Sequence, residues 1–170
     1  GYGATRTLER VAAAIGGVDA APIEFSPAED IPCGGVLLAV PALLAMGLLR
    51  HSAEMYSLPQ GYYGLSSILL LLAMMALARL KSVEQLRYVA PGEWGNLLGL
   101  DRIPEVRTLR AKLELLCWES GRAVRWNTEL AKAWMGLEPE AEPMFYVDGH
   151  VRVYQGKQAQ LPRHYVSRQK

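Results

Sequence analysis

The sequence predicts an α+β fold, in which a mostly helical domain is followed by the first strands of an incomplete sheet. Three observations predict it. Apolar residues recur at helical spacing in several stretches of residues 1–138. An acidic stretch with two prolines, centred on residues 139–143, has the composition of a linker. Beyond it, residues 144–170 begin with apolar and polar residues in alternation, which is the period of a strand.

A short helix is predicted near the start of the chain, over residues 5–15. Two glycines follow it at positions 16 and 17, and they end the pattern. Two prolines then place residues 20–30 in a loop. The apolar residues that share one face of the predicted helix are Leu8, Val11, Ala12 and Ile15.

Two strongly apolar segments come next. Residues 31–49 and residues 64–78 contain no charged side chain. Because about 20 apolar residues span a bilayer, a small two-helix membrane protein is one interpretation. The second segment is short for that purpose, and Pro41 interrupts a helix in the first. We therefore expect a buried helical core and no membrane partner.

The pattern then becomes amphipathic. Residues 82–90 predict a helix with Ser82 as its N-cap. Residues 93–120 predict a helix, a turn and a longer helix, which together form a candidate helix-turn-helix. Gly99 suits the C-cap of the first helix, Asp101 lies in the turn, and Pro104 suits the first turn of the second helix. A further helix is expected over residues 123–135.

The second helix of this pair could contact DNA. A recognition helix presents basic and polar side chains to DNA while its apolar stripe packs on its partner. Such a stripe is predicted here from Val106, Leu109, Leu113 and Leu116, which recur at helical spacing. An ordinary amphipathic helix with a solvated charged face fits the same pattern, because glutamates partly cancel the positive charge. The predicted DNA contacts are Arg107, Thr108, Arg110 and Lys112.

The stretch MFYVDGHVRVYQG, Met144 to Gly156, follows the linker. Asp-Gly between alternating apolar runs predicts a hairpin, so Asp148 suits a tight turn. Asp148 could also end the first strand of a ribonuclease H-like sheet and hold magnesium for phosphodiester chemistry. Two-metal catalysis needs several carboxylates, and no Asp or Glu stands between Asp148 and Lys170. The remaining ligands are therefore expected beyond Lys170.

Net charge and cysteine content say less about function than the motifs above. The net charge of +1 does not by itself indicate a nucleic-acid binder, although residues 151–170 carry five basic residues and no acidic one. The predicted phosphate contacts there are Arg152, Lys157, Arg163 and Arg168. Cys33 and Cys117 show no CxxC spacing, which argues against a zinc or redox motif. We expect two buried thiols in a reduced, cytoplasmic setting.

Several blocks of the chain resemble one known family. The blocks are PCGGVLLAVPALLAMGLL, LPQGYYGLSSILLLLAMMALARLKSVEQLRY, LLGLDRIPEVRTLRAKL, and YVDGHVRVYQGK followed by LPRHYVSRQK. They resemble the N-terminal and early catalytic portion of bacterial transposases with a DDE, ribonuclease H-like catalytic domain. The resemblance implies that Asp148 is the first catalytic acid and a ligand of Mg²⁺. It also implies that the helical part belongs to a DNA-binding or accessory region.

The resemblance therefore makes DNA the expected partner and the nucleoid the expected location, and it leaves homo-oligomerisation open. A complete enzyme of this kind would hydrolyse a DNA strand with metal-activated water and then join a 3′-hydroxyl to target DNA. These 170 residues alone are expected to be inactive. An alternative is a non-catalytic DNA-binding or regulatory module that uses Arg107, Arg110 and Lys112.

Overall fold

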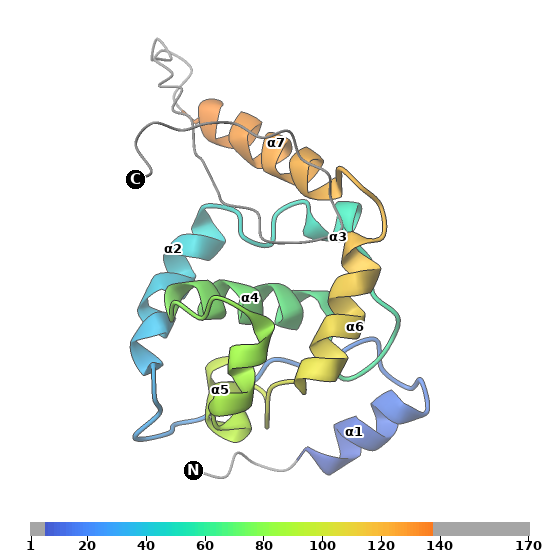
Figure 1. Cartoon of the computed structure of the whole chain (residues 1–170), viewed down its shortest axis with the longest axis vertical. Coiled ribbons are helices and arrows are strands. Elements are labelled where there is room, and N and C mark those ends of the chain that lie inside the picture. The colour runs from blue at the N-terminus through green and yellow to red at the C-terminus, as the bar shows by residue number, and fades with distance from the viewer. Residues whose placement is uncertain (1–5, 138–170) are drawn as a thin grey trace, which may run out of the picture. The chain divides into compact units, whose positions relative to one another are not determined.

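The computed structural model describes residues 6–137, and these residues form helices joined by turns and loops (Figure 1). The α-helices are α1 (Thr7–Ala14), α2 (Val40–Ala45), α3 (Ser52–Met55), α4 (Leu65–Leu77), α5 (Pro91–Leu97), α6 (Val106–Cys117) and α7 (Arg122–Met135). Two 3-10 helices, η1 (Gly34–Ala39) and η2 (Val83–Tyr88), precede α2 and α5.

The predicted α+β class with a ribonuclease H-like sheet is wrong. Residues 6–137 contain no strand, and this part of the chain is all-α. Leu, Ala and Met, which favour helices, dominate its apolar segments. The alternation that predicted strands begins after residue 143, beyond the part of the chain that the structure describes. The hairpin predicted around Asp148 lies outside the described residues.

Helix α4 is the centre of the hydrophobic core. Its sequence, LSSILLLLAMMAL, carries no charge, and Ile68, Leu71 and Met74 are at most 1% exposed. A helix that is apolar on all sides is stable when other elements cover it. Buried side chains of α5 and α6 belong to the same core cluster. The prediction of a buried helical core is therefore confirmed for residues 64–78.

The first apolar segment behaves differently, because it divides into η1 and α2. Pro41 lies at the start of α2, where its missing N–H costs no hydrogen bond. Neither η1 nor α2 contains a fully buried residue, and only part of their surface packs against the core. The expectation of a second buried helix is wrong. Within residues 6–137, no helix is long and apolar enough to cross a membrane.

Helix α1 presents its apolar face to solvent. Leu8 and Ile15 are 83% and 79% exposed, whereas Arg6 and Arg10 contact the rest of the fold. The pattern of apolar residues identified this helix but not the side that packs.

The two cysteines are exposed and free, so the prediction of buried thiols is wrong.

Helix α7 begins one residue before the predicted range and ends where it was predicted to end. Two tryptophans attach it to the segment between α2 and α3. The Trp126 indole N–H donates to the Arg50 carbonyl and that of Trp134 to the Met46 carbonyl, each at 2.7 Å. Trp126 also meets Tyr56 edge to face, with ring centroids 5.6 Å apart. Both tryptophans are structural anchors.

Candidate functional site

The helix, turn and longer helix predicted over residues 93–120 are α5, a turn and α6. Gly99 has φ +64°, a conformation that glycine adopts without strain. Its N–H donates to the Asn96 carbonyl at 3.1 Å, and the Leu100 N–H donates to the Gly95 carbonyl at 2.9 Å. These two bonds form a Schellman motif, which confirms the helix end predicted at Gly99.

The turn then runs back along α5 in close contact with it. A Cβ atom on Gly95 would lie 2.7 Å from the carbonyl carbon of Asp101 and closer still to the backbone of Arg102. The Ile103 N–H donates to the Pro91 carbonyl at 3.0 Å. The backbone of α5 therefore fixes the direction in which the turn enters α6.

Helix α6 begins at Val106, with Glu105 as its N-cap. Pro104 precedes the cap, two residues before the position the sequence suggested. Val106, Leu109 and Leu116 are buried, which confirms an apolar stripe on this helix. No side chain of the described residues caps the first backbone N–H groups of α6. These groups and the helix dipole leave partial positive charge at this end.

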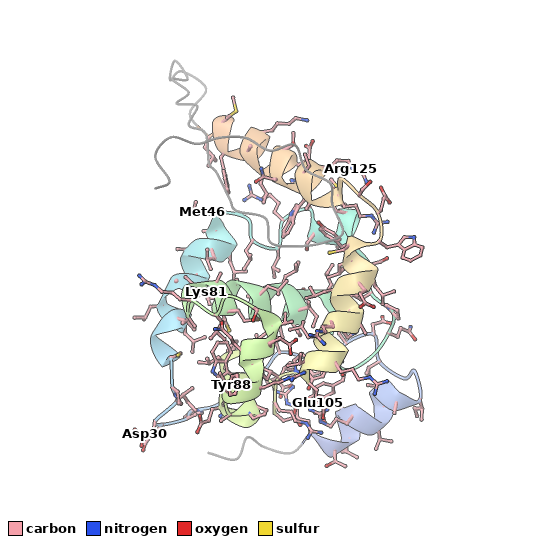
Figure 2. All side chains as sticks on the ribbon, in the orientation of Figure 1. Asp30, Met46, Lys81, Tyr88, Glu105 and Arg125 are labelled. Atoms are coloured by element: carbon pink, nitrogen blue, oxygen red, sulfur yellow. The ribbon has the colours of Figure 1, made fainter. Side chains whose placement is uncertain are left out.

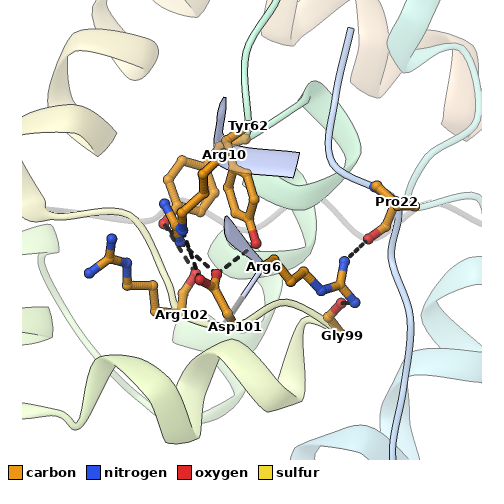
Figure 3. A network of polar contacts seen from close by, with 8 residues as sticks. Arg6, Arg10, Pro22, Tyr62, Gly99, Asp101 and Arg102 are labelled. Atoms are coloured by element: carbon orange, nitrogen blue, oxygen red, sulfur yellow. Dashed lines mark hydrogen bonds and ion pairs between the residues drawn. The ribbon is translucent and has the colours of Figure 1, made fainter. Parts of the chain in front are cut away.

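A polar network joins α1 to this turn (Figure 3). Arg10 donates two hydrogen bonds to the Asp101 carboxylate, at 2.7 and 2.6 Å, and the Tyr62 hydroxyl donates a third at 2.6 Å. The Arg10 guanidinium also lies 4.0 Å from the centre of the Tyr62 ring. Arg6 donates to the Gly99 carbonyl at 3.0 Å. The network holds the turn in one position relative to α1.

The protonation states in this network are well defined. Burial raises the pKa of the Asp101 carboxyl, but the hydrogen bonds from Arg10 and Tyr62 outweigh burial, and the pKa is lowered overall. Burial, with the hydrogen bond to Asp101, raises the pKa of Tyr62 to about 12. Asp101 is therefore ionised at neutral pH, and Tyr62 keeps the proton that it donates. These groups orient the turn and are not suited to proton transfer.

A pocket of about 740 Å³ opens beside this network, at the start of α6. We call it the basic pocket. Its charged lining residues are Arg10, Arg87, Arg102, Arg107 and Glu105. They come from α1, η2, the turn and α6, so the fold gathers arginines from four segments. Arginine holds phosphate with a planar, bidentate fork, and it stays charged at any physiological pH.

Carboxylates reduce this positive charge but do not cancel it. Arg10 is paired with Asp101, and Arg87 is paired with Glu84 at 2.9 Å. Glu84 also forms an ion pair with Arg110, although its buried Oε1 atom there lacks the geometry of a hydrogen bond. Arg107 is exposed and forms no ion pair within the described residues. Together with Arg102 and Glu105, the charged groups in and around the basic pocket are thus five arginines and three carboxylates.

The structure brings together some of the predicted contact residues and separates others. Arg107 and Thr108 line the basic pocket, and Arg110 lies next to it on Glu84. Lys112 lies roughly 160° around the helix from Arg110, beside the buried stripe. It is half-buried, and burial lowers the pKa of its ammonium group. Lys112 therefore does not share the surface of Arg107 and Arg110, although it lies one helical turn beyond Thr108.

The other predicted site residues lie outside the described residues; they are Asp148, Arg152, Lys157, Arg163 and Arg168. Over residues 6–137, no group of three or more His, Cys, Asp or Glu side chains could hold a metal ion. Sequence reasoning also missed Arg10, Arg87 and Arg102. Arg102 follows Asp101 in the predicted turn, which could have indicated it. Arg10 stands 91 residues from Asp101, and no local pattern connects them.

Comparison with known proteins gives one match. A protein-family model described as "Transposase protein" matches residues 1–170. No curated protein and no solved structure matches the chain significantly.

Proposed function

The chain belongs to the transposase protein family, and we propose that its helical part binds DNA through the basic pocket. The gathering of Arg10, Arg87, Arg102 and Arg107 at the uncapped start of α6 carries this proposal. DNA is a polyanion, and arginines and helix N-termini are the protein groups that hold phosphate best. Contacts of this kind supply most of the non-specific affinity of DNA-binding proteins.

The scaffold supports the same conclusion. Hydrogen bonds from Arg10 and Tyr62 fix the turn, and the backbone of α5 packs directly against it at Gly95. The groups around the pocket are therefore ordered before a ligand arrives, which lowers the entropic cost of binding. Helix α6 buries one stripe and exposes Arg107 and Thr108, as a recognition helix does. Arg110 joins this surface if phosphate replaces Glu84 as its partner, whereas Lys112 is not included.

Salt dependence tests the proposal. Each phosphate contact contributes about 0.9 to the slope of log K against log salt concentration. We expect Arg107→Ala to weaken binding to duplex DNA about tenfold and to lower the slope by about 1. Arg125→Ala is the matched control, because it removes the same charge from α7, where Arg125 pairs with Glu119. Equal effects of the two variants on fluorescence anisotropy would argue against a site at the start of α6.

Glu105 offers a test of opposite sign. It lines the basic pocket and is exposed, so its charge opposes an approaching phosphate. Glu105→Gln keeps the size of the side chain and removes that charge. We expect tighter DNA binding by a few-fold at low salt, with the difference fading as salt screens the interaction.

The strand-cleavage chemistry is a second proposal, and it rests on Asp148 and on the resemblance described above. We propose that Asp148 holds Mg²⁺ together with further carboxylates, and that Arg152, Lys157, Arg163 and Arg168 contact phosphates. In the complete protein encoded by the gene, Asp148→Asn should abolish magnesium-dependent strand cleavage and leave DNA binding unchanged. Undiminished cleavage by this variant would make Asp148 a turn residue. DNA binding without any cleavage by the complete wild-type protein would favour the regulatory alternative.

A further inference from the structure

We infer that the basic pocket receives an unpaired nucleotide of the bound DNA, with the base inside the pocket and its phosphate on the arginines. The inference rests on the proposed DNA binding, and it names the form of DNA that the site prefers. It follows from the size of the pocket, from its mixed lining and from one exposed aromatic residue in the segment that lines it.

The size of the pocket suits a nucleotide better than a duplex surface. About 740 Å³ lies within the range of roughly 300–1,000 Å³ that small-molecule sites occupy. In a duplex the bases are stacked inside, and the protein reaches only backbone phosphates and base edges in the grooves. A base enters a pocket of this kind only when it is unpaired or turned out of the stack. A nearly flat basic surface would have sufficed for backbone contacts alone.

The lining has two chemical parts, as a nucleotide does. Leu86, Val89, Ile103 and Val106 supply apolar surface, and arginines supply the charge. The faces of a base are apolar and polarisable, while its attached phosphate is anionic. Guanidinium planes also stack on bases, so the arginines can contact both parts. Apolar lining would contribute little to a site that held inorganic phosphate alone.

Tyr88 is an exposed aromatic residue in the segment that forms one wall of the pocket, although it is not itself a lining residue. It stands between Arg87 and Val89, which both line the pocket, and it is itself 88% exposed (Figure 2). An aromatic ring this exposed contributes little to folding and is free to reorient. Stacking of a base on an aromatic side chain strengthens single-strand binding by about fivefold to more than a hundredfold per base. We assign Tyr88 the role of stacking the nucleotide next to the one in the pocket.

The experiment uses three DNA probes of one sequence. The first is a blunt duplex, the second carries a short unpaired 3′ extension, and the third carries the same extension with abasic nucleotides. The second and third probes have the same phosphates and differ only in the bases. Wild-type protein should bind the base-bearing extension at least about tenfold more tightly than the abasic one. Tyr88→Ala should remove most of this preference, and Tyr88→Phe should retain it.

Trp118→Ala is the matched control. Trp118 is 89% exposed and follows the last residue of α6, so it is an equally exposed aromatic at the other end of the helix. We expect the Trp118 variant to keep the preference and both alanine variants to melt at the wild-type temperature. Equal affinity for the base-bearing and abasic extensions would overturn the inference. If duplex binding still responded to Arg107→Ala in that case, the proposed function would stand; absence of DNA binding altogether would overturn both.

Discussion

Replacing Gly95 with alanine should destabilise the fold by about 2 kcal/mol, because this glycine lets the turn before α6 lie directly on α5. The added Cβ would stand 2.7 Å from the Asp101 carbonyl carbon and nearer still to backbone atoms of Arg102. Ordinary contacts between carbon atoms are about 3.5–4.0 Å. The neighbouring atoms are all backbone, so no side chain can rotate away to make room.

The magnitude follows from two opposing effects. Overpacking of a close contact costs about 1–3 kcal/mol, and the upper end applies where the backbone must move. Alanine in a helix gains back about 0.4–1 kcal/mol over glycine, because it restricts the unfolded chain. The difference is a loss of about 2 kcal/mol. With a urea dependence of roughly 2 kcal/mol per molar, the unfolding midpoint should fall by about 1 M.

Urea unfolding followed by circular dichroism measures this shift, with Gly35→Ala as the matched control. Gly35 lies in the 3-10 helix η1, and a Cβ there would meet no atom within 4 Å. The same substitution should therefore change stability by no more than about 0.5 kcal/mol. A folded Gly95 variant should also bind DNA more weakly than the Gly35 variant, because displacing Arg102 alters the basic pocket.

The reasoning would be refuted if Gly95→Ala and Gly35→Ala unfolded at the same urea concentration. That result would mean that the turn does not pack against α5 as closely as the structure shows.

Three further predictions concern the polar contacts. Asp101→Asn should cost about 2–3 kcal/mol of unfolding free energy, because it leaves the half-buried Arg10 without its counterion. Since the pKa of Asp101 is lowered, wild-type stability should fall as pH drops below its ordinary value of 3.8, and the Asn variant should lack that component of the loss. At alkaline pH, ionised Tyr62 is disfavoured in the folded state, so stability should fall as pH rises from 10 towards 12. Burial also raises the pKa of Tyr56 and Tyr63, so Tyr62→Phe should reduce this dependence in a pH-jump unfolding assay without abolishing it. Trp126→Phe removes the indole N–H that donates to the Arg50 carbonyl, so the free energy of unfolding should fall by about 1 kcal/mol in a thermal melt. An unchanged melting curve would mean that this bond does not help to anchor α7.

Local patterns predicted the local parts of this structure well. The glycine at position 99 and the spacing of Val106, Leu109 and Leu116 were enough to place the end of α5 and the buried stripe of α6. Both features depend on residues within one or two helical turns of each other. Burial of α4 was predictable for a similar reason. A helix of thirteen residues without a charged side chain is apolar on all sides, and such a helix is stable only when other elements cover it.

Features that depend on distant contacts were not predictable. An apolar stripe indicates which residues share a face but not whether anything covers that face, and on α1 the stripe stays exposed. The segment 31–49 has the composition of a core helix, yet Pro41 and Gly47 divide it into shorter pieces at the surface. Only part of the basic pocket could be predicted from the sequence. Arg107 and Thr108 belong to one predicted helix, whereas Arg10 and Arg87 come to the site from distant segments through the tertiary fold.

The way α1 is attached explains how the pocket keeps its geometry. The turn buries Leu100 and Ile103 in the core, but hydrophobic burial is roughly proportional to area and has no preferred direction, so it holds the turn close without fixing its orientation by itself. Hydrogen bonds depend on distance and angle. Arg6 and Arg10 use them to hold Gly99 and Asp101, while the apolar face of the same helix makes little contact. Loss of α1 should therefore disturb the start of α6 far more than it disturbs the core. The outer face of α6 can vary in sequence without moving the pocket, because the groups that position it belong to α1, Tyr62 and the backbone of α5.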